Sequence, residues 1–184
     1  MRIVGGKYGR RRFDTPSNFR GRPTTDLAKE GLFNILAHRI DIEGIRVLDL
    51  FSGTGSVGFE FLSRGASAVL AVERNQHHVA FIRKVEETLQ DPHHQVIMKD
   101  VLRFIREHTH DGDGRYEGGY DVVFADPPYQ MPELPLLPDM ILRSQLLAPD
   151  GLLIMEHPRE VSFEEHPRFE EVRSYGSVHF SFFI

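Results

Sequence analysis

The sequence predicts an α/β fold in which a doubly wound sheet of seven mostly parallel strands forms one domain. From residue 45 to residue 156, short apolar runs alternate with segments of helical periodicity. This alternation is typical of parallel strands whose crossover helices cover both faces of one sheet. Residues 169–184 instead place two strand-like runs around Tyr175-Gly176-Ser177, which predicts an antiparallel hairpin at the C-terminus.

Length and composition restrict the class of protein. A chain of 184 residues suits a single core that buries roughly two-thirds of the unfolded surface. Because there is no cysteine, disulfides, thiolate zinc sites and cysteine nucleophiles are excluded. No apolar run approaches the roughly 18 residues that span a bilayer, and the N-terminus has no apolar signal region. We therefore expect a cytoplasmic protein that does not bind membranes.

The charge is unevenly distributed along the chain. The net charge is −5, but residues 1–23 carry +6, which leaves −11 for residues 24–184. A basic arm, residues 1–23, on an acidic domain, residues 24–184, is a plausible footprint for a polyanion, with a solvated, partly disordered terminus as the alternative. The candidate RNA-binding residues are the basic side chains of this arm: Arg2, Lys7, Arg10, Arg11, Arg12, Arg20 and Arg22.

Residues 24–40 predict a helix that precedes the sheet. Thr24 or Thr25 can cap its first turn, and Asp26 carries the charge that suits the positive end of a helix. Leu27, Leu32, Ile35 and Leu36 would form its apolar stripe.

The elements that follow are separated by changes in hydrophobic rhythm. Apolar runs predict strands at 45–50, 68–73, 95–98, 121–125 and 151–156. Helical spacing of apolar residues predicts helices at about 56–64, 76–89, 101–108 and 135–145. Ligands of doubly wound folds bind beyond the carboxyl ends of the strands, so the loops there are the places to look for a site.

A glycine-rich loop follows the first strand. Gly53-x-Gly55-x-x-Gly58 permits a tight turn with open backbone amides, and Asp49 and Phe51 stand just before it. The spacing also matches the fingerprint of dinucleotide-binding loops. A glycine-rich strand-to-helix turn that binds no ligand is a further alternative. Since the Asp49 carboxylate accepts from an ammonium group, this loop suits an amino-acid-bearing ligand better than a pyrophosphate.

Two further acids end the next two strands. Glu73 lies about twenty residues beyond the glycine loop, where a carboxylate bonds ribose hydroxyls, and Asp100 can accept from an exocyclic amine with Val101 beside the ring. Helix capping is the alternative for both acids. Together with Arg74, these residues predict a site for an adenosine that bears an amino-acid tail.

Asp126-Pro127-Pro128-Tyr129 follows the fourth strand. An exocyclic amine is a poor nucleophile because its lone pair is delocalised into the ring. The Asp126 carboxylate and the Pro127 carbonyl can accept its two N–H bonds, and proline rigidity keeps these acceptors aimed. Tyr129 offers a face on which an unstacked base can lie, a contact worth roughly 1–3 kcal/mol.

The chain now resembles the class I S-adenosylmethionine (SAM) methyltransferases, which share a Rossmann-like fold. Its tetrapeptide matches their (Asp/Asn)-Pro-Pro-(Tyr/Phe) signature for amino nitrogens. The wider pattern, "RIVGGKYGRR", "RPTTDLAKEGLFNIL", "VLDLFSGTGSVGFEFLSRGA", "VERN" and "DPPY", resembles the RsmD-type enzymes that methylate a guanine N2 in 16S ribosomal RNA. The chain departs from many members of that family in the segments "DPHHQV" and "HDGDGRYEGG". These departures concern the surface on which RNA docks more than the chemistry.

The resemblance implies SAM as cofactor, S-adenosylhomocysteine as product, and 16S rRNA within an assembling small ribosomal subunit as partner. It implies that Thr24 and Thr25 lie against the SAM pocket and that the basic arm helps to hold RNA. We expect a monomer. Because the predicted sheet leaves no residues for a recognition domain, a compact enzyme whose RNA substrate supplies its own shape is favoured over a sequence-specific DNA methyltransferase. We expect no metal, and we expect His77, His78, His93 and His94 to be solvated surface residues.

Three alternatives remain open. An adenine-N6 methyltransferase acting on DNA or another RNA would share every catalytic motif. A nicotinamide-dependent dehydrogenase would use the glycine loop but leaves Asp126-Pro127-Pro128-Tyr129 without a role. A non-catalytic RNA-binding assembly factor would keep the pocket without turnover.

Overall fold

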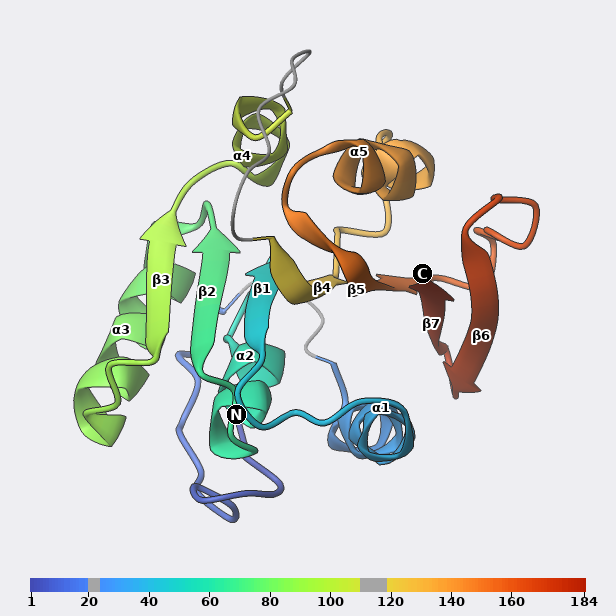
Figure 1. Ribbon diagram of the computed structural model, residues 1–184. Coiled ribbons are helices and arrows are strands. Elements are labelled where there is room, and N and C mark those ends of the chain that lie inside the picture. The colour runs from blue at the N-terminus through green and yellow to red at the C-terminus, as the bar shows by residue number, and fades with distance from the viewer. Residues whose placement is uncertain (20–23, 110–118) are drawn as a thin grey trace.

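Seven strands form one sheet in the computed structural model, which describes residues 1–19, 24–109 and 119–184 (Figure 1). Their order is β3-β2-β1-β4-β5-β7-β6. The first five pair in parallel, and β7 runs antiparallel between β5 and β6, which confirms the predicted sheet and its C-terminal hairpin. The strands are β1 (Arg46–Leu50), β2 (Ala68–Glu73), β3 (His94–Met98), β4 (Tyr120–Ala125), β5 (Leu147–His157), β6 (Phe169–Tyr175) and β7 (Val178–Phe183).

Helices cover both faces of the sheet. The larger apolar core lies between the sheet and α1, α2 and α3, and the smaller core lies beneath α4 and α5 on the opposite face (Figure 1). β1 belongs to both, because Val47 packs into the first core and Leu48 into the second. The helices are α1 (Asp26–Arg39), α2 (Ser56–Ser63), α3 (Gln76–Leu89), α4 (Val101–Glu107) and α5 (Leu137–Arg143), with a 3-10 turn η1 (Leu134–Leu136) before α5.

Two predicted elements differ from the structure by more than a shift of one or two residues at their ends. The helix predicted at 135–145 is split into η1 and α5, because Pro135 and Pro138 lack the amide donor that a helix interior needs and occupy first turns instead. β5 begins at Leu147 rather than at residue 151, since Leu147 pairs with Tyr120 across a register shift in β4. Among the described helices, none is long and apolar enough to cross a membrane.

Residues 1–13 form a hairpin that packs onto α2. The Ile3 amide donates to the Arg11 carbonyl at 3.0 Å, and the Arg10 amide donates to the Ile3 carbonyl at 2.8 Å. The Ile3 side chain is fully buried in the larger core. The first half of the basic arm is therefore ordered. The division of the chain into an arm of residues 1–23 and a domain of residues 24–184 stays a prediction.

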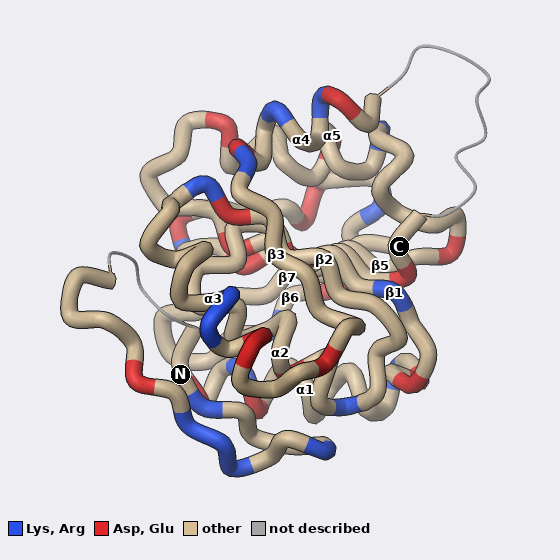
Figure 2. Tube along the Cα trace, turned by 90° about the vertical axis from the view of Figure 1, so that its left-hand side faces the viewer, with Lys and Arg blue, Asp and Glu red and all other residues tan. Residues whose placement is uncertain are grey.

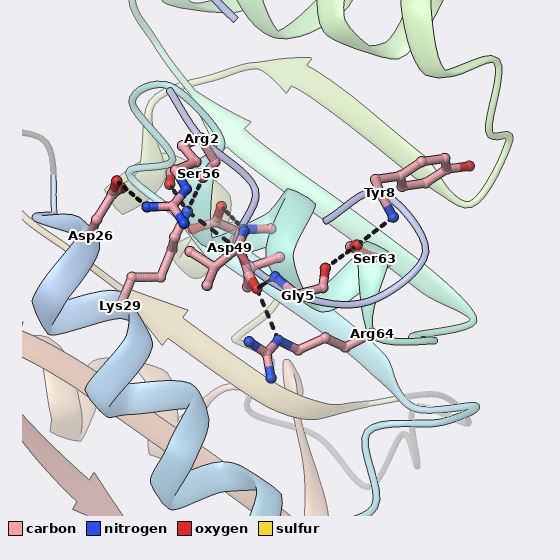
Figure 3. A network of polar contacts seen from close by, with 12 residues as sticks. Arg2, Gly5, Tyr8, Asp26, Lys29, Asp49, Ser56, Ser63 and Arg64 are labelled. Atoms are coloured by element: carbon pink, nitrogen blue, oxygen red, sulfur yellow. Dashed lines mark hydrogen bonds and ion pairs between the residues drawn. The ribbon is translucent and has the colours of Figure 1, made fainter. Parts of the chain in front are cut away.

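A buried polar network fastens this hairpin to α1 and α2 (Figure 3). The Glu60 carboxylate, fully buried in α2, accepts from the backbone amides of Val4 and Gly5, each at 2.8 Å. Lys29, fully buried in α1, donates to the Arg2 carbonyl and has its Nζ 3.5 Å from Glu60 Oε2. Burial lowers the pKa of Lys29, and the Glu60 charge opposes that effect.

Candidate active site

A cavity of about 970 Å³ opens beyond the carboxyl ends of the parallel strands. Its size is that of a pocket for a cofactor-sized ligand. It gathers acids from the ends of five different strands, and the sequence predicted four of these acids as site residues. The predicted residues that line it are Thr24, Asp49, Phe51, Gly53, Glu73, Arg74, Asp100, Val101, Asp126, Pro127, Pro128 and Tyr129.

Two predicted cofactor residues do not line the cavity. Thr25 caps α1, where its side chain accepts from the Ala28 amide at 3.2 Å. Gly55 begins α2 in the left-handed conformation, with φ of 74°, and a β-carbon there would meet the Phe59 ring.

Glu73 holds the glycine loop in place. Its Oε2 accepts from the Gly53 amide at 2.9 Å, and its Oε1 accepts from the Asn75 amide at 2.8 Å. Carboxylate oxygens accept more than one hydrogen bond each, so these contacts are compatible with the predicted bonds to a ribose. The predicted ribose acceptor thus also joins the ends of β1 and β2.

Asp49 lies on the cavity floor with almost no exposed surface. Its Oδ2 accepts from the Gly58 amide at 3.1 Å. Burial raises the pKa of Asp49 to about 7, the Gly58 hydrogen bond opposes this rise, and the Glu73 charge adds to it. A cation bound nearby would favour the ionised form of this carboxyl group.

Asp126 is the first residue after β4, where its amide donates to the Leu50 carbonyl at 3.3 Å. Burial raises the pKa of Asp126 well above its ordinary value, and the charges of Glu156 and Asp49 raise it further. The Pro128 carbonyl accepts from the Met131 amide at 2.9 Å within the following turn. The role of the Pro127 carbonyl as an acceptor stays a prediction.

Glu156, in β5, connects two walls of the cavity. The Tyr129 hydroxyl donates to its Oε1 at 3.2 Å, and the Thr24 hydroxyl donates to its Oε2 at 2.8 Å. Sequence reasoning assigned Glu156 no role. Its position at the end of a predicted strand, which is the position that indicated Glu73 as a site residue, could have indicated Glu156 as well.

Negative charge dominates the lining. Among the described residues of the wall, Arg74 is the one lysine or arginine, and its Nη1 lies 3.8 Å from Asp100 Oδ2. Such a cavity attracts a ligand with ammonium or sulfonium groups and disfavours a pyrophosphate. The acids that line it are Asp49, Glu73, Asp100, Asp126, Glu133 and Glu156. Within the described chain, no group of three or more His, Asp or Glu side chains is placed to hold a metal ion.

His78 and Phe19 form a wall that the sequence did not predict. Their rings stack with centroids 4.1 Å apart, and both line the cavity. The expectation of solvated histidines is wrong for His78 and for His94, which are 7% and 5% exposed. His78 is buried on the apolar face of α3, and the His94 ring stacks on the buried Phe59 with centroids 4.1 Å apart, while its Nδ1 lies 2.8 Å from Glu86 Oε1.

The predicted RNA-binding residues do not all present free charge. Lys7 Nζ lies 2.7 Å from Asp91 Oδ2, and Arg2 Nη1 lies 3.7 Å from Asp26 Oδ2. The exposed cations of the hairpin are Lys7, Arg10, Arg11 and Arg12, and of these Lys7 is the one paired with Asp91. Figure 2 shows lysines and arginines spaced along this segment near the N-terminus. Arg20, Arg22 and most of "HDGDGRYEGG" lie outside the described residues.

Comparison with known proteins identifies the family. A family model described as Conserved hypothetical protein 95 matches residues 1–184. "Putative rRNA methyltransferase YlbH" of Bacillus subtilis (strain 168) is 34% identical over 166 residues, which cover 90% of this chain and 86% of that protein.

"Ribosomal RNA small subunit methyltransferase D" of Escherichia coli (strain K12) is 29% identical over 156 residues, 85% of this chain and 74% of that protein. A solved structure of a hypothetical protein from Thermus thermophilus matches with a TM-score of 0.83 and 28% identity, and covers 100% of this chain and 98% of that one. The sheet order and its antiparallel edge are those of SAM-dependent methyltransferases. The chain belongs to the Conserved hypothetical protein 95 family, the family of the RsmD-type methyltransferases.

Proposed function

We propose that this protein transfers a methyl group from SAM to the exocyclic N2 amine of a guanine in 16S rRNA of the small ribosomal subunit. One observation carries the proposal: Asp126-Pro127-Pro128-Tyr129 lines the same acidic cavity as the glycine loop. A cofactor held by that loop would therefore meet a substrate amine held by the tetrapeptide. The relatives named as rRNA methyltransferases support RNA as the substrate.

The cofactor side of the cavity fits SAM. SAM supplies an electrophilic methyl group on a sulfonium cation, next to an ammonium-bearing tail. Asp49 offers a carboxylate on the cavity floor that a cation would keep ionised, and Glu73 stands where a ribose diol can donate to it. Asp100 caps α4 by accepting from the Arg103 amide at 3.0 Å, and it faces the cavity beside Val101 for the adenine.

The acceptor side fits an amine attached to an aromatic ring. Asp126 and the Pro127 carbonyl would accept the two amine hydrogens, which favours a pyramidal nitrogen with its lone pair aimed at the methyl carbon. Tyr129 would stack on the extruded base, and its bond to Glu156 keeps the ring in place. The buried walls exclude water from the reacting atoms.

The exposed cations of the hairpin would hold the phosphate backbone. Arg10, Arg11 and Arg12 are exposed on an element that the core anchors through Ile3, so the cations have a fixed position relative to the cavity. The same acceptor geometry would serve an adenine N6. The choice of guanine rests on the resemblance of the N-terminal motifs and on the relative named small subunit methyltransferase D.

Replacing Asp126 by alanine tests the assignment. We expect methyl transfer to fall at least about 100-fold, because one of the two aimed acceptors is lost. SAM affinity by calorimetry should stay within about threefold, since the cofactor contacts belong to other loops. Asp150→Ala, an exposed acid in β5, is the matched control. Retained turnover in the Asp126 variant would refute its catalytic role.

A further inference from the structure

Glu156 is placed beside Asp126 by the register of the sheet. β4 and β5 are parallel neighbours, and Ala125 pairs with Met155. Asp126 follows Ala125, and Glu156 follows Met155, so the two acids occupy matching positions. Side chains at matching positions of neighbouring parallel strands project to the same face. Both side chains line the cavity, and Glu156 is only 3% exposed.

The carboxylate of Glu156 is held in a fixed direction. The Tyr129 hydroxyl donates to one oxygen at 3.2 Å and the Thr24 hydroxyl donates to the other at 2.8 Å. Because each carboxylate oxygen accepts more than one hydrogen bond, these contacts aim the group without disqualifying it as an acceptor for a ligand. Its neighbour Asp126 experiences its charge, since Glu156 raises the pKa of Asp126.

Two neighbouring acceptors match one purine better than the other. Guanine presents two adjacent donors on its Watson–Crick edge, the N2 amine and N1–H. Adenine presents the N6 amine beside N1, which is an acceptor. A carboxylate next to the amine-holding Asp126 would bond N1–H of guanine, and it would face a lone pair of adenine.

We propose that Glu156 selects guanine over adenine by accepting a hydrogen bond from N1–H of the target base. The proposal rests on the proposed function, because it concerns the acceptor side of the same cavity. Rejection of adenine then comes from an unpaired acceptor facing a carboxylate, which is a stronger penalty than a merely missing contact. Specificity is thereby assigned to this chain's own residues, separate from RNA docking.

Base analogues test this selection directly. The target guanine in 16S rRNA is replaced, by splinted ligation, with 2-aminopurine or 2,6-diaminopurine, and the RNA is reconstituted with small-subunit proteins. Both analogues keep the C2 amine and lack N1–H, and they differ at C6. For the unmodified enzyme we expect kcat/KM for methylation of the C2 amine to fall at least about 100-fold with each analogue.

The ratio of kcat/KM for guanine to kcat/KM for each analogue measures the selection. The Glu156→Gln variant should narrow this ratio to within about tenfold, because an amide accepts from guanine through its oxygen and donates to the analogue N1 through its nitrogen. Glu160→Gln, an exposed acid just beyond β5, should keep the full ratio. Tyr129→Phe, which removes the hydroxyl that bonds Glu156 and keeps the ring, should narrow the ratio less than Glu156→Gln does, because the Thr24 hydroxyl still bonds the other carboxylate oxygen.

The outcomes separate two failures. If the unmodified enzyme puts no label on guanine N2, the proposed function is wrong. If it methylates guanine but accepts 2-aminopurine within about threefold, or if Glu156→Gln keeps the full ratio, the selection by Glu156 is overturned. A ratio that Glu160→Gln narrows as much as Glu156→Gln would also overturn it, since the effect would then not depend on the carboxylate that faces the base.

Discussion

Replacing Glu60 by glutamine should destabilise the protein strongly while changing its shape little. The fully buried Glu60 carboxylate accepts from the amides of Val4 and Gly5 and from Arg64 Nε at 2.9 Å. It also lies 3.5 Å from the ammonium group of Lys29. Glutamine keeps one acceptor oxygen but turns an amide donor toward a cluster that consists of donors.

The magnitude follows from the burial of both partners. Removing one member of a buried ion pair typically costs about 3–5 kcal/mol, because the other charge stays buried without compensation. Since burial already lowers the pKa of Lys29, loss of its proton limits the cost to the lower part of that range. With a urea dependence of about 2 kcal/mol per molar, the unfolding midpoint should fall by about 1.5 M.

Urea unfolding followed by circular dichroism measures the effect, with Glu87→Gln on the exposed face of α3 as the matched control. That control should stay within about 0.5 kcal/mol of the unmodified protein. A second variant, Lys29→Met combined with Glu60→Gln, should recover part of the loss, because no fully buried ammonium group is then left without its carboxylate partner. A loss below about 1 kcal/mol for Glu60→Gln alone would refute the idea that this network anchors the hairpin.

Two further predictions concern the hairpin and the cavity floor. Neutralising Arg10, Arg11 and Arg12 together should raise the KM for RNA and reduce the slope of log affinity against log salt concentration by about two to three. An unchanged slope would mean that these side chains contact no phosphate. Asp49→Asn should remove a pH dependence of stability. Because the pKa of Asp49 is raised from 3.8 to about 7, its protonated form is favoured in the folded state, and the stability of the cofactor-free protein should fall as pH rises from about 4 to 7. Unfolding measured at pH 5 and pH 8 should differ less in the variant, and parallel behaviour of both proteins would contradict the buried titration.

Local pattern predicted most of the sheet and the acids at its strand ends. β2 and α3 begin and end where apolar periodicity placed them, because each is flanked by clear turn or cap residues. The start of β5 at Leu147 could not be predicted this way, since it depends on pairing with Tyr120, a contact distant in sequence. Hydrophobic periodicity depends on residues that are close in sequence, so it carries no information about partners on a neighbouring strand.

The same limit explains the missed site residues. Phe19 lies in a segment without regular structure, where no period indicates which side chain turns inward. His78 was predicted as a surface residue because no acidic or cysteine partner stood at ligand spacing, although its helical position is buried and its Nδ1 lies 3.6 Å from Glu73 Oε2. Glu156 needed knowledge that β4 and β5 are neighbours, which places it beside Asp126.

Mapping of the methyl group tests the central claim most directly. Total ribosomal RNA from a strain lacking the enzyme, free and within small subunits, is incubated with the protein and methyl-tritiated SAM, then digested to nucleosides and mapped by fragment. The proposed function predicts label on N2-methylguanosine at a single position of 16S rRNA. Label on N6-methyladenosine, label on 23S rRNA, or no label on any RNA would contradict it.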